Sequence, residues 1–139
     1  MLIYLAGAIS IHDRNDEYHK ATDWRKNAGS HLRLLGYEIF NPTVNFHVNL
    51  SSVSSESVVA QNKLYLKNSD LMLVNIADLK ESPGTIWEIY MAKEWEIPVI
   101  AFGESGLAWS PHISTSLTEE FDTMGNAINH ITNMYHLKI

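Results

Sequence analysis

Short apolar runs alternate with longer amphipathic segments along this chain, and this alternation limits the possible folds more than any other feature of the sequence. Residues 2–6, 70–76 and 97–102 are apolar at nearly every position. Strands have this pattern when both of their faces are covered, as in parallel sheets. Helical segments between such strands imply right-handed crossovers. The sequence therefore predicts a parallel sheet covered by helices.

The segments between the apolar runs have helical periodicity. Apolar residues at steps of three and four predict the first helix, which Gly36 ends. A short strand at 37–40 follows it, and Asp122 or Thr123 is expected to cap the last helix. The helices are predicted over residues 21–35, 58–68, 85–95 and 122–135.

The elements in this order predict one α/β domain over residues 1–139, with a doubly wound parallel sheet in a flavodoxin-like or Rossmann-like three-layer sandwich. Residues 44–57 are rich in serine and have no period, so we expect a surface loop or lid there. Ligands of such sheets bind beyond the carboxyl ends of the strands. Function is therefore expected in the loops after Ala6, Phe40, Ile76 and Phe102.

Composition and charge exclude several classes of partner. The chain has 139 residues, 45% hydrophobic and 19% charged, which is typical of a folded domain. A formal net charge of −6 offers no positive field to a nucleic-acid polymer. Without cysteine, neither disulfides nor thiolate catalysis is possible. The sequence has no basic leader and no run of ~20 apolar residues, so we expect a cytoplasmic protein that contacts no membrane.

Glu88 is the first candidate for chemistry. It follows the central strand, after Ser82-Pro83-Gly84, and shares a helix face with Met91 and Ala92, which directs its carboxylate towards the ligand crevice. The nearby helix N-terminus would favour the ionised form that a nucleophile needs. The alternative is a capping box, in which Glu88 accepts a hydrogen bond from the backbone N–H of Thr85. Pattern alone leaves both interpretations open.

Two polar side chains on apolar elements are further candidates. Asn62 interrupts the apolar face of the predicted helix 58–68, so it either bonds to nearby backbone or holds a substrate hydroxyl or base. Tyr4 in the first strand is either a core residue or a donor to a carboxylate at the crevice. The seven histidines have no metal-binding spacing, and the chain has no nucleophile elbow, GxGxxG or P-loop. We expect no metal or organic cofactor.

Four blocks of sequence resemble those of a known family. They are IYLAGAI at the start, GYEIFNP after the first helix, NSDLMLVNI around the central strand, and SPGTIWEIYMAKEWEIPVIAF. On these blocks, which span most of the chain, it resembles the nucleoside 2-deoxyribosyltransferase-like proteins, which include deoxynucleoside 5′-monophosphate N-glycosidases. The resemblance implies that Glu88 is the nucleophile, that Tyr4 orients its carboxylate and that Asn62 contacts the substrate.

The same resemblance implies a homo-oligomer in which Ser110 helps to complete the pocket of a neighbouring subunit. The loop residues Ala6, Gly7, Ser82 and Gly84 are the other expected substrate contacts. Many transferases of the family have Asp six residues before the nucleophile, where this chain has Ser82, as in the monophosphate glycosidases. A hydroxyl can donate to a phosphate that a carboxylate would repel.

These observations predict an enzyme that cleaves the N-glycosidic bond of a 2′-deoxynucleoside or its 5′-monophosphate. Attack by Glu88 would give a covalent glutamyl-deoxyribosyl intermediate, and transfer to a second nucleobase would complete the reaction. Asn62 cannot protonate the leaving base as a carboxylic acid would. The alternatives are a hydrolytic 5′-monophosphate N-glycosidase, a non-catalytic nucleotide-binding module and a purely structural partner. Trp87 and Trp109 are either base-stacking residues or core residues.

Overall fold

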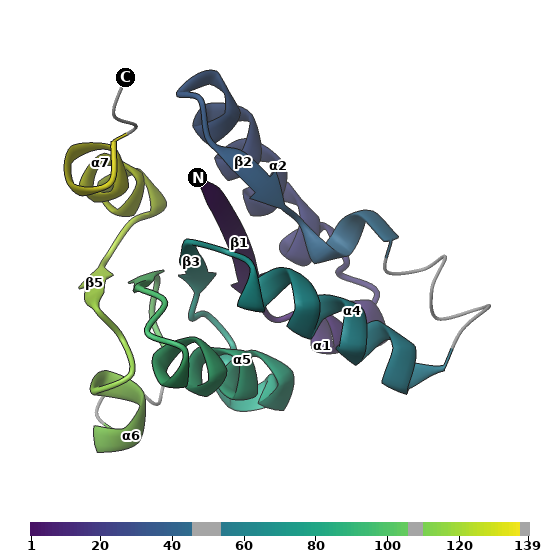
Figure 1. Cartoon of the computed structure of the whole chain (residues 1–139). Helices are drawn as coiled ribbons and strands as arrows, with labels where there is room; N and C mark the ends of the chain where they lie inside the picture. Colours follow the sequence, from purple (N-terminus) through teal and green to yellow (C-terminus); the bar gives the residue numbers. More distant parts are fainter. Residues whose placement is uncertain (46–53, 106–109, 137–139) are drawn as a thin grey trace.

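The protein folds around one five-stranded parallel sheet with strand order β2-β1-β3-β4-β5 (Figure 1). The computed structural model describes residues 1–45, 54–105 and 110–136. This order is that of a flavodoxin-like sheet, so the predicted doubly wound α/β fold is confirmed. The strands are β1 (Leu2–Gly7), β2 (Glu38–Phe40), β3 (Leu71–Asn75), β4 (Val99–Phe102) and β5 (Glu119–Phe121).

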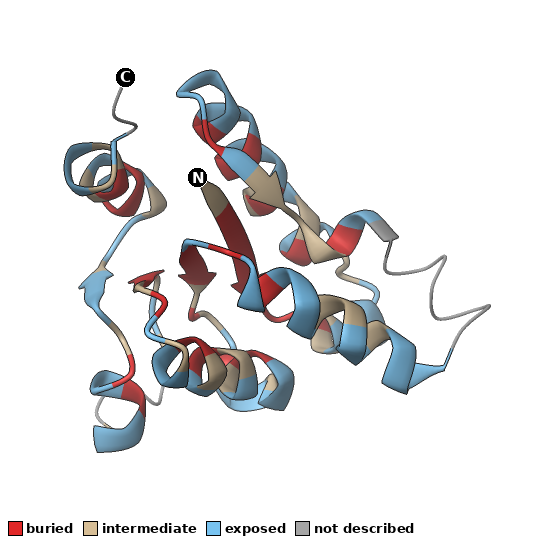
Figure 2. Cartoon of the chain, in the orientation of Figure 1, coloured by how far each residue is buried: buried red, intermediate tan, exposed pale blue. Residues whose placement is uncertain are grey.

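Two pairs of helices cover the two faces of the sheet. On one face lie α2 (His19–Leu34) and α7 (Met124–Met134), and on the other lie α4 (Ser55–Lys67) and α5 (Pro83–Glu94). The central strands β1, β3 and β4 and the inward sides of the helices are largely buried, whereas the edge strands β2 and β5 are partly exposed and the outward sides of the helices are exposed (Figure 2). No helix in the described part of the chain is long and apolar enough to cross a membrane.

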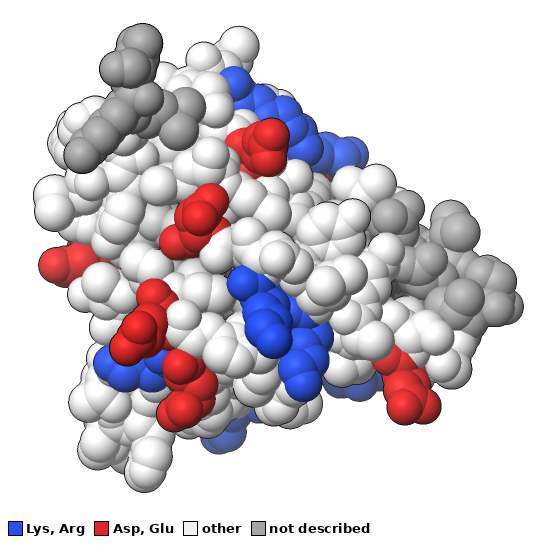
Figure 3. All heavy atoms as spheres, in the orientation of Figure 1, with Lys and Arg blue, Asp and Glu red and all other residues white. Residues whose placement is uncertain are grey.

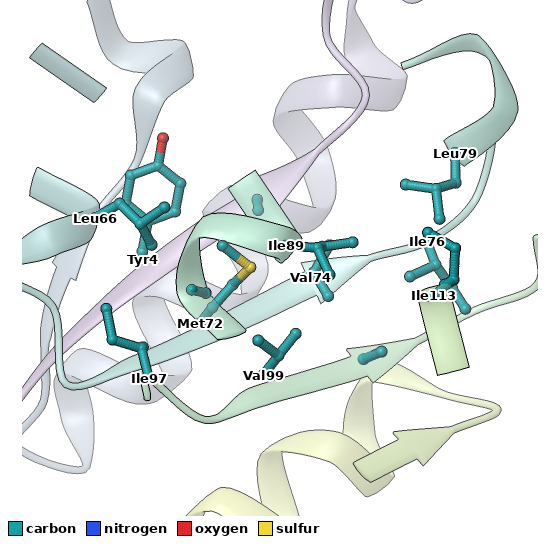
Figure 4. Packing of buried hydrophobic residues seen from close by; sticks show 13 residues of the cluster. Tyr4, Leu66, Met72, Val74, Ile76, Leu79, Ile89, Ile97, Val99 and Ile113 are labelled. Atoms are coloured by element: carbon teal, nitrogen blue, oxygen red, sulfur yellow. The ribbon is translucent and has the colours of Figure 1, made fainter. Parts of the chain in front are cut away.

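Alternate residues of each central strand supply the two halves of the core. In β1, Ile3 and Leu5 pack towards α2 and α7, whereas Tyr4 and Ala6 pack towards α4 and α5. This arrangement explains why the strands read as continuous apolar runs, since both faces of the sheet are dry. In Figure 4 the ring of Tyr4 lies among the apolar side chains, and its hydroxyl points away from the rest of the cluster.

The structure also has elements that the periodicity did not predict. Four of these elements are short helices of five residues or fewer. Another is the edge strand β5, which contains two exposed glutamates and so does not have the apolar sequence of a buried strand. The short helices are α1 (Ser10–Arg14), η1 (Pro42–Asn45), η2 (Leu79–Glu81) and α6 (Pro111–Ser114).

The predicted loop over 44–57 is partly wrong, because α4 already begins at Ser55. The Ser54 side chain caps α4 by accepting a hydrogen bond from the backbone N–H of Ser57 at 3.2 Å. The last serines of this tract therefore belong to the cap and the first turn of the helix and not to a loop. The middle of the tract, residues 46–53, lies outside the described residues. At the last helix, the hydroxyl of Thr123 accepts from the backbone N–H of Asn126 at 3.2 Å, which makes Thr123 rather than Asp122 the cap.

Both edges of the sheet are short. β2 and β5 have three residues each, and Glu38, Glu119 and Glu120 on them are exposed. β2 pairs with β1 only as far as Tyr4 and Phe40, whereas β1 continues to Gly7. The last residues of β1 therefore extend beyond their neighbour on one side.

Candidate active site

A cavity of about 570 Å³ opens at the carboxyl ends of β1 and β3. The chain leaves β1 towards α2 on one face and leaves β3 towards α5 on the other, so the cavity lies at the topological switch point of the sheet. Its size is that of an ordinary small-molecule site. The lining residues come from the end of β1, α1, Pro42, α4, η2 and the first turns of α5.

Glu88 and Tyr4 meet at the inner end of this cavity. The Tyr4 hydroxyl donates a hydrogen bond to Oε2 of Glu88, which lines the cavity and is half-buried. Tyr4 itself is fully buried, with its ring 5.2 Å from that of Phe40. Tyr4 thus has both of the roles considered from the sequence, because its ring belongs to the core and its hydroxyl fixes a carboxylate.

The structure contradicts the capping-box interpretation of Glu88. Helix α5 begins at Pro83, two residues earlier than predicted, and Ser82 occupies the position before it. The backbone N–H of Thr85 donates to the carbonyl of Ser82 at 3.1 Å, while the hydroxyls of Ser82 and Thr85 lie 2.6 Å apart. Glu88 is therefore in the second turn of α5, and its carboxylate is bonded to Tyr4.

Burial decides the charge state of Glu88. Desolvation raises the pKa of Glu88 from an ordinary value of 4.5 to about 7, against the opposing effects of the Tyr4 hydrogen bond and the charge of Arg25. The helix N-terminus does not prevent this rise, because the field of the helix falls off within the first turn. A carboxyl group with this pKa is ionised in about half of the molecules near neutral pH. Burial also raises the pKa of Tyr4, which keeps its hydroxyl protonated as the donor.

Arg25 lies behind this pair on α2 and was not anticipated from the sequence. Its side chain is 1% exposed, and the guanidinium donates to the carbonyls of Leu5, Gly7 and Ala21. The signal was present in the sequence, because Arg25 occupies the apolar stripe of the helix between Ala21 and Ala28.

Helix α4 forms one wall of the cavity. Asn62 lines it, half-buried, next to Val58 and Val59. Leu66 is the one residue of α4 that is fully buried, while Tyr65, predicted on the same apolar face as Asn62, is 41% exposed. The Tyr65 ring stacks on Phe40 at 4.1 Å, which anchors the helix over the end of β2.

The cavity lining also carries positive charge that the sequence did not reveal. Arg14 of α1 and Lys80 of η2 line the cavity together with one acidic residue, Glu81. Ser82 and Gly84 at the start of α5 also line the cavity, and open space surrounds the position of a Cβ at Gly84. On the face shown in Figure 3, acidic and basic side chains form several small groups, with uncharged surface between most of them.

Of the residues expected to contact substrate, Gly7, Asn62, Ser82, Gly84 and Glu88 line the cavity. Ala6 does not line it and is buried in the core beside Tyr4. Ser110, expected to serve a neighbouring subunit, precedes α6 and does not line this cavity either. Trp87 is 40% exposed on the outer side of α5, away from the lining, and Trp109 lies outside the described residues.

Comparison with known proteins identifies the family. A sequence profile described as nucleoside 2-deoxyribosyltransferase like matches residues 1–105. The chain belongs to this family. The match includes all of the elements that form the cavity. A search of curated protein sequences finds no match.

A solved structure extends the similarity to the whole fold. The chain is similar to a 2-deoxyribosyltransferase from the psychrotolerant bacterium Bacillus psychrosaccharolyticus, described as a biocatalyst for the synthesis of antiviral and antitumoral nucleosides. The TM-score is 0.76 at 25% sequence identity, over 99% of this chain and 98% of the other. The family and this neighbour support a deoxyribosyltransferase-like enzyme that acts on small nucleoside substrates.

Among the described residues, no group of three or more histidine, aspartate or glutamate side chains could hold a metal ion. The polar side chains that line the cavity carry carboxylate, hydroxyl, amide and cationic groups.

Proposed function

We propose that this protein cleaves the N-glycosidic bond of a 2′-deoxynucleoside or its 5′-monophosphate and transfers the deoxyribose to another nucleobase. The observation that carries the proposal is the Tyr4–Glu88 pair, a desolvated carboxyl group held by a buried hydroxyl at the inner end of a ligand-sized cavity. Family membership and the similar 2-deoxyribosyltransferase support the reaction class.

In the proposed first step, an Oε atom of ionised Glu88 attacks C1′ of the sugar. The bond from C1′ to the base nitrogen breaks through an oxocarbenium-like transition state, and its electron pair leaves with the base, which takes a proton from water. The products are the free base and a deoxyribosyl ester of Glu88. The nitrogen of a second base then attacks C1′, loses its proton to solvent and restores the Glu88 carboxylate.

The Tyr4 hydrogen bond limits the carboxylate to one orientation, so the free oxygen lone pairs of Glu88 face the cavity. Partial desolvation makes the ionised carboxylate more basic than it would be in water, which favours attack on an electrophilic carbon. Asn62 on the α4 wall is the proposed contact to a sugar hydroxyl or the base, since its amide both donates and accepts.

A second candidate function is hydrolysis of a deoxynucleoside 5′-monophosphate, with water in place of the second base. The observation that favours a phosphate is that Arg14, Lys80 and Ser82 all line the cavity, with Ser82 at the start of α5. Two cations, a hydroxyl and the backbone N–H groups of a helix N-terminus are the donors that bind a phosphate. Glu81, which also lines the cavity, opposes this preference in part.

We also propose that the protein assembles as a homo-oligomer. Trp87 and Tyr90 on α5 are 40% and 38% exposed, and Val59 and Leu64 on the adjacent α4 are 49% and 60% exposed. A second copy would cover these apolar side chains. Light scattering of the wild type and of Trp87→Lys tests this: a monomeric wild type would overturn the proposal.

The decisive experiment is incubation with a deoxynucleoside, and separately with its 5′-monophosphate, each with and without a foreign free base. Chromatography follows the released base and any new nucleoside. We expect exchange or release that is abolished in Glu88→Ala, and mass spectrometry of the wild type should detect deoxyribose bound to the peptide that contains Glu88. Release of base without exchange, together with a preference for the monophosphate that is lost in Lys80→Ala, would favour the second candidate.

Retained turnover in Glu88→Ala would refute the mechanism. Saturable binding of the nucleotide without any product would indicate the non-catalytic binding module. A matched control is Glu94→Gln, an exposed carboxylate on the same helix and outside the cavity lining, which should leave turnover unchanged.

A further inference from the structure

Arg25 is the largest of the fully buried side chains, and its position needs a physical reason. A guanidinium carries five N–H donors and a permanent charge, so burial is costly unless acceptors surround it. No carboxylate of the described residues lies within ion-pair distance of Arg25. Its hydrogen-bond acceptors are backbone carbonyls instead.

Two of these carbonyls belong to the end of β1 that extends beyond β2. Backbone carbonyls along a strand point alternately to its two neighbours, and that of Met1 faces β2, where it accepts from Glu38. The carbonyls of Leu5 and Gly7 face the same side, but β2 ends at Phe40.

Arg25 supplies the hydrogen-bond donors that a longer β2 would otherwise provide to these two carbonyls. Its Nη2 donates to Gly7 at 2.9 Å and its Nε to Leu5 at 3.4 Å, while Nη1 donates to Ala21 of its own helix at 2.7 Å. The guanidinium carbon lies 4.7 Å from the ring centre of Trp24. The charge is thus fixed at the end of β1, immediately behind the cavity that Gly7 lines.

The charge of Arg25 acts on the Tyr4–Glu88 pair from behind. Attraction to the Arg25 guanidinium lowers the pKa of Glu88, opposing the larger effect of burial. Burial lowers the pKa of Arg25 to about 10, so it remains protonated at neutral pH. Glu88 therefore ionises in the field of a cation that is held by backbone carbonyls and buried from water.

We propose that Arg25 is a positioning residue for Glu88, which holds the carboxyl end of β1 behind the cavity and supplies the buried positive charge that allows Glu88 to ionise. The proposal rests on the nucleophilic role of Glu88 proposed above. Few other titratable groups face Glu88. The neutral hydroxyl of Tyr4 contacts it from β1, and the exposed side chains of Arg14, Lys80 and Glu81 line the same cavity. The residues of α4 that line the cavity are uncharged.

Two variants separate the charge of Arg25 from its geometry. Arg25→Gln removes the charge but retains two N–H donors for the carbonyls, and Arg25→Lys retains the charge but loses the planar fork. Arg33→Gln is the matched control, because Arg33 is exposed on the same helix. Circular dichroism and thermal unfolding of each variant establish that it is folded.

The first measurement is the titration of Glu88 by ¹³C NMR of labelled glutamate carboxyl groups, with the Glu88 signal assigned by its loss in Glu88→Gln. In Arg25→Gln we expect the pKa of Glu88 to rise by about one unit, because an opposite charge is removed. In Arg25→Lys and Arg33→Gln the Glu88 titration should be unchanged. An unshifted titration in folded Arg25→Gln would overturn the proposed role of the charge.

The second measurement is the pH profile of kcat/KM for base release or exchange. The acidic limb should move to higher pH by about one unit in Arg25→Gln, which is about a tenfold loss below the pKa. In Arg25→Lys the limb should stay in place while kcat falls at every pH. Should Arg25→Gln not fold, Arg25→Lys decides, and full kcat or a shifted limb in that variant would overturn the proposal.

The two measurements also distinguish this proposal from the proposed function. A wild type without any turnover, but with a Glu88 titration that responds to Arg25→Gln, would refute the function and retain the electrostatic link. If the wild type turns over substrate but the pKa of Glu88 is the same in wild type and in Arg25→Gln, the electrostatic link between Arg25 and Glu88 is refuted and the proposed function is retained.

Discussion

Replacing Glu88 by glutamine should make the protein more stable, and increasingly so as the pH rises. The amide of Glu88→Gln has nearly the shape of the protonated carboxyl group, and its oxygen can still accept the hydrogen bond from Tyr4. The variant therefore represents Glu88 locked in its neutral form. The wild type differs from it only when Glu88 ionises.

The size of the effect follows from the raised pKa. Because the pKa of Glu88 is higher in the folded state, the protonated group stabilises the fold fully below its ordinary value of 4.5, and this contribution is lost as the pH rises through about 7. The complete difference corresponds to about 3 kcal/mol. Between about pH 5 and about pH 8, the stability advantage of Glu88→Gln should grow by roughly 2.5 kcal/mol.

Urea unfolding of both proteins at these two pH values measures the effect, since other titrating groups contribute equally to wild type and variant. The control is Glu94→Gln, an exposed glutamate of the same helix, for which the difference should change by less than about 0.5 kcal/mol. An advantage of Glu88→Gln that does not grow with pH, or a variant less stable than wild type at about pH 8, would show that ionised Glu88 is well solvated or well paired.

Four further predictions concern single side chains. Tyr4→Phe should lower base release by about tenfold to a hundredfold, as expected for a lost bond to a charged group, and unchanged rates would contradict the orienting role of Tyr4. Leu66→Ala should cost about 2–5 kcal/mol in urea unfolding because Leu66 is fully buried; a loss below ~1 kcal/mol would show that the core closes over the gap. Thr123→Ala should cost about 1 kcal/mol and Thr123→Ser much less, which calorimetry can compare. Gly103→Ala should cost about 1–2 kcal/mol, because Gly103 has φ +97° and a Cβ would lie 3.1 Å from Oδ1 of Asn75; an unchanged melting temperature would exclude that strain.

The sheet was predictable because its central strands are buried on both faces. A strand of this kind is recognisable in the sequence as a continuous apolar run, and β1, β3 and β4 are all such runs. The edge strand β5 lacks the signal, since Glu119 and Glu120 are exposed and its existence depends on pairing with β4. Edge strands are therefore determined by their neighbours rather than by their own composition.

Site residues could be predicted from the sequence only where the position of the residue in the pattern, or in the family's motifs, itself indicated a role. Glu88, Tyr4 and Asn62 were identified from position and family resemblance, but the start of α5 two residues early removed the capping alternative, and only the structure shows this. Arg14, Lys80 and Arg25 were missed, because their roles depend on which segments the fold brings together. An arginine within an apolar helical stripe is nevertheless a signal that sequence reasoning can use.

The short edges of the sheet determine how the protein can associate with itself. An exposed strand edge is a template for continued β-pairing, which leads to fibrils or irreversible aggregates. Here each edge strand has only three residues and carries exposed glutamates, so a second strand would find few bonds and like charges. Contacts between copies are left to the helical surfaces, where association can be reversible and of defined stoichiometry. Concentrated solutions of this protein should therefore remain free of thioflavin-positive material for as long as the fold is intact.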